Sequence, residues 1–251
     1  MVRNPLRRVS ALAFVMIIGT AAAFVEATPA VAVPRQAAGT YTATFPDTAT
    51  TSTLVITNAT ASTTSGSFEF TDFGDFGTWL AQGTTVAFQV AASSSGHDGA
   101  VLLAKLKTTG LDPGAISVPG NDAQPWSATR VATTGAHAVT AATATTASAR
   151  PQASQPFVYA AVFDGTVQDT LTVLRYGGTT KAGIFGLSNL HDLGTWVKLG
   201  KKIALGITNG DDAGILLLGT QTKSTIGTPA APAAYYEQST GIHPWYATRT
   251  S

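Results

Sequence analysis

The sequence predicts an all-β protein made of two tandem, homologous antiparallel β-barrel or β-sandwich domains of about eight short strands each, after an N-terminal signal peptide. The first observation is an internal repeat. The segment DFGTW at 75–79 recurs as DLGTW at 192–196, 117 residues later, and matched hydrophobic and glycine positions continue on both sides of it. Each copy also closes on a nearly identical phrase, PWSATR at 125–130 and PWYATR at 244–249. The chain therefore contains two copies of one domain.

Composition is the second observation. Of the 251 residues, 44% are hydrophobic and only 12% are charged, while Thr, Ala, Ser and Gly are abundant. This mixture is rich in strand and turn formers and poor in the residues that fill helices. The formal net charge of +1 provides no basic field for nucleic acid or an anionic membrane. The absence of cysteine excludes a disulfide scaffold and zinc–thiolate sites.

Residues 1–32 have the pattern of a secretory signal peptide. Arg3, Arg7 and Arg8 form a charged start, an apolar run follows at 11–25, and small residues at 30–32 suit a signal peptidase. The apolar run is short for a membrane-spanning helix, which is the alternative interpretation. We therefore expect a secreted mature protein that does not remain in the membrane.

The first domain copy is predicted at 33–131. Large and small residues alternate within short segments, and turn-forming pairs containing Gly, Pro or Asp separate them. No segment keeps a helical apolar period, so the pattern favours a barrel or a sandwich of short strands. The predicted strands lie at 40–45, 53–57, 67–71, 85–90, 100–104 and 127–131.

Residues 132–156 change in character. They consist mainly of Ala, Thr, Ser and Val with prolines near the end, a composition that has too little bulk for a core. We interpret this tract as a linker, and the second copy then occupies 157–251.

The repeated tryptophans and arginines are the candidate binding residues. Large aromatic side chains usually pack in cores, but in a barrel of about eight strands they can also line a mouth that holds one small ligand. An arginine at a strand end can cover aromatic surface and bond carbonyl groups. Both interpretations stay open for Trp79, Trp126, Trp196, Trp245, Arg130 and Arg249.

The repeated aspartates Asp75 and Asp192 are a candidate acidic site. An aspartate beside a turn usually bonds the local backbone, whereas acid–base catalysis needs two carboxylates about 5–10 Å apart in one cleft. No histidine is shared by the two copies, and no metal-binding histidine spacing or nucleophile motif occurs. We therefore predict no catalytic residue, no metal site and no cofactor.

The closing phrase WSATRV at 126–131 resembles the last-strand region of the avidin-type biotin-binding barrels, and 245–249 repeats it. The opening GTY at 39–41 and TVAF at 85–88 are also similar to strands of that family. The resemblance implies an eight-stranded barrel in each copy. The Asn and Ser with which the family's first strand binds the biotin ring are replaced here by ATFPD at 43–47, so biotin binding is not implied.

Together these patterns favour a secreted, non-catalytic protein that binds a small apolar or sugar ligand, or a cell-wall component, through its barrels. Two tandem sites on one chain would gain effective concentration. Contact between the two copies is a further expectation. A secreted hydrolase that uses the repeated aspartates, and a structural surface protein without a small ligand, are the alternatives.

Overall fold

A computed structural model of the protein describes residues 36–60, 62–131, 156–176 and 181–251. The predicted signal peptide and all of the predicted linker except residue 156 lie outside these residues. Within the described part, no helix is long and apolar enough to cross a membrane. The all-β prediction is confirmed, and each copy is a closed barrel rather than a sandwich.

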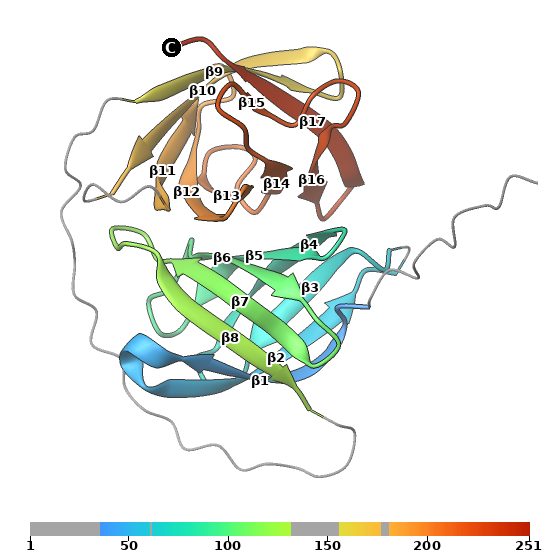
Figure 1. The fold of residues 1–251 in the computed structure, drawn as a ribbon, viewed down its shortest axis with the longest axis vertical. Helices are drawn as coiled ribbons and strands as arrows, with labels where there is room; N and C mark the ends of the chain where they lie inside the picture. Colours follow the sequence, from blue (N-terminus) through green and yellow to red (C-terminus); the bar gives the residue numbers. More distant parts are fainter. Residues whose placement is uncertain (1–35, 61, 132–155, 177–180) are drawn as a thin grey trace, which may run out of the picture. The chain divides into compact units, whose positions relative to one another are not determined.

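The first copy is an antiparallel barrel in which eight strands follow one another in sequence order (Figure 1). It closes where the first strand pairs with the eighth, with Tyr41 opposite Arg130 and Thr44 opposite Ser127. A single 3-10 turn, η1 (Pro46–Thr48), joins the first two strands. The strands are β1 (Gly39–Phe45), β2 (Thr50–Asn58), β3 (Ser65–Phe70), β4 (Asp75–Gln82), β5 (Thr85–Ser93), β6 (Val101–Leu106), β7 (Gly110–Ser117) and β8 (Gln124–Arg130).

The second copy closes in the same way, through pairing of its last strand with its first. In this copy two short strands, β15 and β16, pair with β17 where β7 pairs with β8 in the first copy. The strands are β9 (Phe157–Phe163), β10 (Val167–Arg175), β11 (Ala182–Leu187), β12 (Asp192–Leu199), β13 (Lys202–Asn209), β14 (Leu216–Thr220), β15 (Thr225–Ile226), β16 (Ala233–Glu237) and β17 (Gly241–Arg249).

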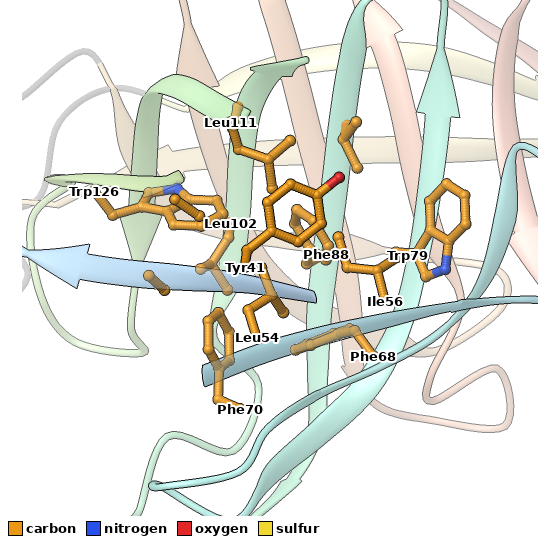
Figure 2. Packing of buried hydrophobic residues seen from close by; sticks show 14 of the residues in the cluster. Tyr41, Leu54, Ile56, Phe68, Phe70, Trp79, Phe88, Leu102, Leu111 and Trp126 are labelled. Carbon is orange, nitrogen blue, oxygen red and sulfur yellow. The ribbon is translucent and has the colours of Figure 1, made fainter. Parts of the chain in front are cut away.

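Alternation along the strands builds each barrel interior. In β1, Tyr41 and Ala43 are buried while the threonines that alternate with them, Thr40, Thr42 and Thr44, are exposed. Figure 2 shows how Tyr41, Phe68, Phe88 and Trp126 gather with aliphatic side chains in the first barrel. Residues of a strand alternate between its two faces, so the inward set forms one continuous apolar core.

A second apolar layer covers the outer faces of β4–β7 and of β12–β14 and β16, because the two barrels belong to one compact unit and pack against each other there. On these strands the residues between the inward-facing ones are therefore apolar as well. The buried members of this layer are Leu80, Ala87, Val101, Leu103, Ala115, Val197, Ala204, Leu216, Leu218 and Tyr236.

One pair of polar contacts between the barrels is reciprocal. Thr78 Oγ1 donates to the carbonyl of Gly214 at 3.3 Å, and the equivalent Thr195 donates to the carbonyl of the equivalent Gly99. The interface therefore has the self-complementary pattern of a two-fold dimer contact, although a single chain makes it.

Candidate functional site: the mouth of the first barrel

The first barrel has a cavity of about 240 Å³ at one end. We call this end mouth 1 and define it by the four connections 46–49, 71–74, 94–100 and 118–123. The cavity is lined by Phe45, Asp47, Thr48, Thr50, Phe70, Phe73, Asp75, Val90, His97, Ala100, Leu102, Ile116, Val118, Asn121 and Gln124.

Three phenylalanines form an aromatic wall of the cavity. Phe45 lies between Phe70 and Phe73, with ring centroids 5.7 and 5.6 Å away. Beneath them, Trp126 stacks on Phe45 at 6.2 Å and meets Phe70 edge to face. Rings at these separations fix one another's orientation, so the wall is preformed.

A fixed polar cluster lies beside this wall. Asp75 is only 3% exposed; its Oδ1 accepts a hydrogen bond from the Ser93 hydroxyl, and its Oδ2 lies 2.7 Å from His97 Nδ1. The Ser93 hydroxyl in turn accepts the backbone N–H groups of Ser95 and His97. These contacts tie the connection between β5 and β6 to the start of β4.

The hydrogen bond that His97 Nδ1–H donates to Asp75 raises the pKa of His97 above its usual value of 6.5, and this effect outweighs the opposing effect of burial. Because the Asp75 carboxylate holds Nδ1–H, the second ring nitrogen, Nε2, is the one left to interact with a ligand. The cavity lining includes this histidine, and Phe73 meets its ring edge to face at 5.6 Å.

Several acceptors at mouth 1 have no partner among the described residues, and one of them is the buried Oδ1 of Asp122. The side-chain Oδ1 of Asn121 is buried and makes no hydrogen bond. The carboxylate of Asp47 is exposed and forms neither an ion pair nor a hydrogen bond. A ligand could therefore satisfy acceptors here without displacing an existing bond.

The second barrel has the same mouth, partly filled by two larger side chains. By strand register, Ile215 takes the place of Ala100 and Tyr235 takes the place of Ile116. The cavity is about 160 Å³ in this copy. The Tyr235 hydroxyl donates to Asp164 Oδ2 at 2.7 Å across the opening.

Tyr235 is held by a small network. Its ring stacks on His243 at 5.0 Å, and His243 Nδ1 lies 3.3 Å from Asp164 Oδ1. Burial, followed by the bond to Asp164, raises the pKa of Tyr235, so the hydroxyl stays protonated and continues to donate.

The second aspartate, Asp192, has a different environment from Asp75. Asp212 takes the position of His97, and its backbone N–H donates to Asp192 Oδ1 at 3.3 Å, while the buried Oδ2 of Asp192 has no partner. Burial raises the pKa of Asp192 from 3.8 to about 6, and the nearby charges of Asp212 and Asp211 act in the same direction. Asp75 and Asp192 thus lie in separate barrels and do not form one carboxylate pair.

The four tryptophans lie in the barrel interiors. In the part of the chain that the structure describes, none of them lines the cavity at either mouth. Each is at most 3% exposed, and each indole N–H donates to a backbone carbonyl: Trp79 to Thr57, Trp126 to Ala115, Trp196 to Leu174 and Trp245 to Ala234. Of the four, Trp126 is linked to mouth 1 by its stacking on Phe45.

The two arginines lie at the barrel ends opposite the mouths. The Arg130 guanidinium is 4.9 Å from the Tyr41 ring centroid and donates to the Tyr41 hydroxyl and to the carbonyls of Gln36 and Ala38. Arg249 lies 4.5 Å over the ring of Phe157. These are contacts that cover aromatic surface and bond carbonyl groups at a barrel end.

Of the residues that line mouth 1, Asp75 alone was singled out from the sequence as a candidate site residue. His97 looks unremarkable there because the two copies differ in loop length, and only strand register shows that it replaces Asp212. The signal in the sequence that could have revealed the site was the pair His97-Asp98 in a loop of the first copy, matched by Asp211-Asp212 in the equivalent loop of the second.

Comparison with known proteins adds no relative. No protein-family model, no curated protein and no solved structure matches the chain.

Proposed function

We propose that this is a secreted, non-catalytic protein that binds a small, largely apolar ligand in mouth 1. The observation that supports the proposal most directly is the cavity itself. It combines a preformed aromatic wall with a few fixed polar groups, which is the usual composition of a small-molecule site.

The cavity has room for a ligand with a single ring. An apolar cavity of about 150 Å³ is sufficient for benzene. Mouth 1 offers about 240 Å³, so it can take a ring that carries a short substituent, whereas the 160 Å³ of the second barrel is enough for the bare ring alone.

The difference between the copies also supports a binding role for the first. The same barrel can fill this space with Ile215 and Tyr235, so the smaller residues Ala100 and Ile116 are not a requirement of the fold. An unfilled cavity reduces stability because its lining loses dispersion contacts. A ligand that occupies the cavity would restore them.

A hydrolase that uses Asp75 and Asp192 has less support. The two carboxylates lie in different barrels, and both oxygens of Asp75 already accept hydrogen bonds. The Ser93 hydroxyl donates to Asp75 and not to His97, so it lacks the contact by which a histidine activates a serine.

The test transfers the filled mouth to the first barrel. The double variant Ala100→Ile, Ile116→Tyr should fold and should bind benzyl alcohol, a ring with a substituent, much more weakly than the natural protein does, measured by isothermal titration calorimetry. The reciprocal variant Ile215→Ala, Tyr235→Ile is the matched control and should gain a second binding site.

Native mass spectrometry of the protein from its own culture medium completes the test. A discrete added mass that disappears in the Ala100→Ile, Ile116→Tyr variant would identify the natural ligand and show that the protein is secreted. If neither the natural protein nor the reciprocal variant binds any probe or carries added mass, the small-ligand proposal is wrong and a structural surface role is favoured.

A further inference from the structure

We infer that mouth 1 selects a ligand carrying an amine, bound as the ammonium ion, over a neutral or carboxylate ligand of the same size. This inference rests on the proposed function and specifies the chemistry of its ligand. Three features of mouth 1 support it: the charge around the opening, the unpaired acceptors and the aromatic wall.

The charge around mouth 1 is one-sided. The connections and strand ends that form it contain five acidic residues and no lysine or arginine, and His97 is the only titratable base there. The basic residues in the described part of this barrel lie towards the opposite end. The acidic residues of mouth 1 are Asp47, Asp72, Asp75, Asp98 and Asp122.

His97 does not reverse this charge. When its ring is protonated, the imidazolium is paired at 2.7 Å with Asp75, so the pair is neutral as a unit. The other four carboxylates around the opening remain. The field at the cavity entrance therefore attracts cations and opposes carboxylates.

The unpaired atoms are suited to a donor. A buried Oδ1 such as that of Asn121 gains most from an N–H or O–H group, because leaving it unpaired is costly. Asp47 adds a free carboxylate at the rim of the same cavity. An ammonium group has three donors and no acceptor, so it suits either of these acceptors.

The aromatic wall favours the same charge. Phe45, Phe70 and Phe73 line the cavity, and an ammonium group within about 6 Å of a ring face is attracted by the ring quadrupole. A carboxylate has no such attraction and would be repelled by the acidic residues around the opening.

The experiment compares three probes of equal size: benzylamine, benzyl alcohol and benzoate, titrated into the natural protein by calorimetry at pH 7 and low salt. Benzylamine should bind about two- to thirtyfold more tightly than benzyl alcohol, which is the range expected for a cation–π contact. Benzoate should bind most weakly. Added salt should reduce the amine preference and leave the affinity for the alcohol unchanged.

Two variants locate the preference. Asp47→Asn should reduce the advantage of benzylamine over benzyl alcohol about threefold, because it removes an unpaired charge at the rim. Asp164→Asn, at the filled mouth of the second barrel, is the matched control and should change neither affinity. Asn121→Leu should weaken benzylamine and strengthen toluene, since the buried acceptor is replaced by apolar surface.

The outcomes separate this inference from the proposed function. If benzyl alcohol binds in mouth 1 and benzylamine binds no more tightly, or benzoate binds best, the amine inference is wrong while ligand binding stands. If no probe binds and the Ala100→Ile, Ile116→Tyr variant behaves like the natural protein, both are wrong.

Discussion

At the residue scale, one repeated aspartate has acquired opposite energetic roles in the two copies. Asp75 is buried with both oxygens bonded, one of them to a histidine. Asp192 is buried with one oxygen unpaired and another carboxylate beside it. A buried carboxylate with partners stabilises a fold, whereas an unpaired one costs free energy when it ionises.

The two asparagine variants should therefore change stability in opposite directions. At pH 7, Asp192→Asn should raise the free energy of unfolding by about 1–3 kcal/mol, and Asp75→Asn should lower it by a similar amount, as expected for relieving or creating an unsatisfied buried group. Urea denaturation followed by tryptophan fluorescence measures both. Changes of the same sign in the two variants would contradict this assignment.

The pH dependence of the same variants provides an independent check. The folded state holds a proton on Asp192 up to about pH 6, while the unfolded state releases it near 3.8, so the natural protein should lose stability as pH rises between these values. Asp192→Asn should remove that loss, and below pH 4 its advantage should disappear. Because the pKa of His97 is raised in the folded state, this residue contributes stability that is fully present below pH 6.5 and is lost as the pH rises through the pKa of the folded state. Asp75→Asn should abolish this second pH dependence.

At the scale of the strands, the glycine of the repeated Gly-Thr-Trp phrase allows a close approach of backbones. Both copies have a register shift immediately before it, at Phe76/Gly77 and at Leu193/Gly194. A Cβ atom at Gly77 would lie 1.8 Å from the carbonyl oxygen of Gln89, and at Gly194 2.1 Å from that of Gly206. The obstacle is backbone in each case, so no side-chain rotation relieves it.

Alanine at either position should consequently be strongly destabilising. We expect Gly77→Ala and Gly194→Ala each to lower the free energy of unfolding by about 3 kcal/mol, the upper part of the range for overpacking. Gly186→Ala is the control, because its nearest obstacle is a leucine side-chain atom at 3.3 Å, and it should stay within about 0.5 kcal/mol. Equal effects at all three positions, measured by urea denaturation, would show that the register shift is not the reason for the glycine.

Strands in which apolar and polar residues alternate could be predicted from the sequence, and strands without that alternation could not. Strands such as 85–90 have a clear two-residue period. By contrast, β7 contains the turn formers Gly110, Asp112, Pro113 and Gly114. It is nevertheless a strand, because β6 pairs with it on one side and β8 on the other, with a register shift in each pairing. Mouth 1 could not be predicted from the sequence either. It combines residues from four connections, most of which differ in length between the two copies, so the internal repeat does not align them.

At the scale of the whole molecule, the apolar layer between the barrels couples their stabilities. Leu103 is fully buried there although it points away from the interior of its own barrel. Each barrel alone would expose this surface to water, so separation of the barrels carries a hydrophobic cost.

A charge in that layer should uncouple the two barrels. We expect the natural protein to unfold in one calorimetric transition and Leu103→Glu to unfold in two, because a carboxylate buried without a partner favours separation. Phe76→Glu is the control: this residue is 56% exposed on the same barrel, and the variant should keep a single transition. A single transition at lower temperature in Leu103→Glu would mean that the barrels unfold together for another reason.

The two-fold pattern of the contact between the barrels is broken where Gln89 meets Gly206. Gln89 and Gly206 are equivalent positions that face each other, and the Gln89 side-chain amide donates to the carbonyl of Ile207. A Cβ at Gly206 would lie 2.8 Å from the Gln89 side chain. Two first-copy barrels would bring two glutamines into collision at this place, and two second-copy barrels would leave a gap. This contact therefore favours pairing between a first-copy and a second-copy barrel over pairing between like barrels, so the two halves of this chain, separated and mixed in solution, should form heterodimers rather than homodimers.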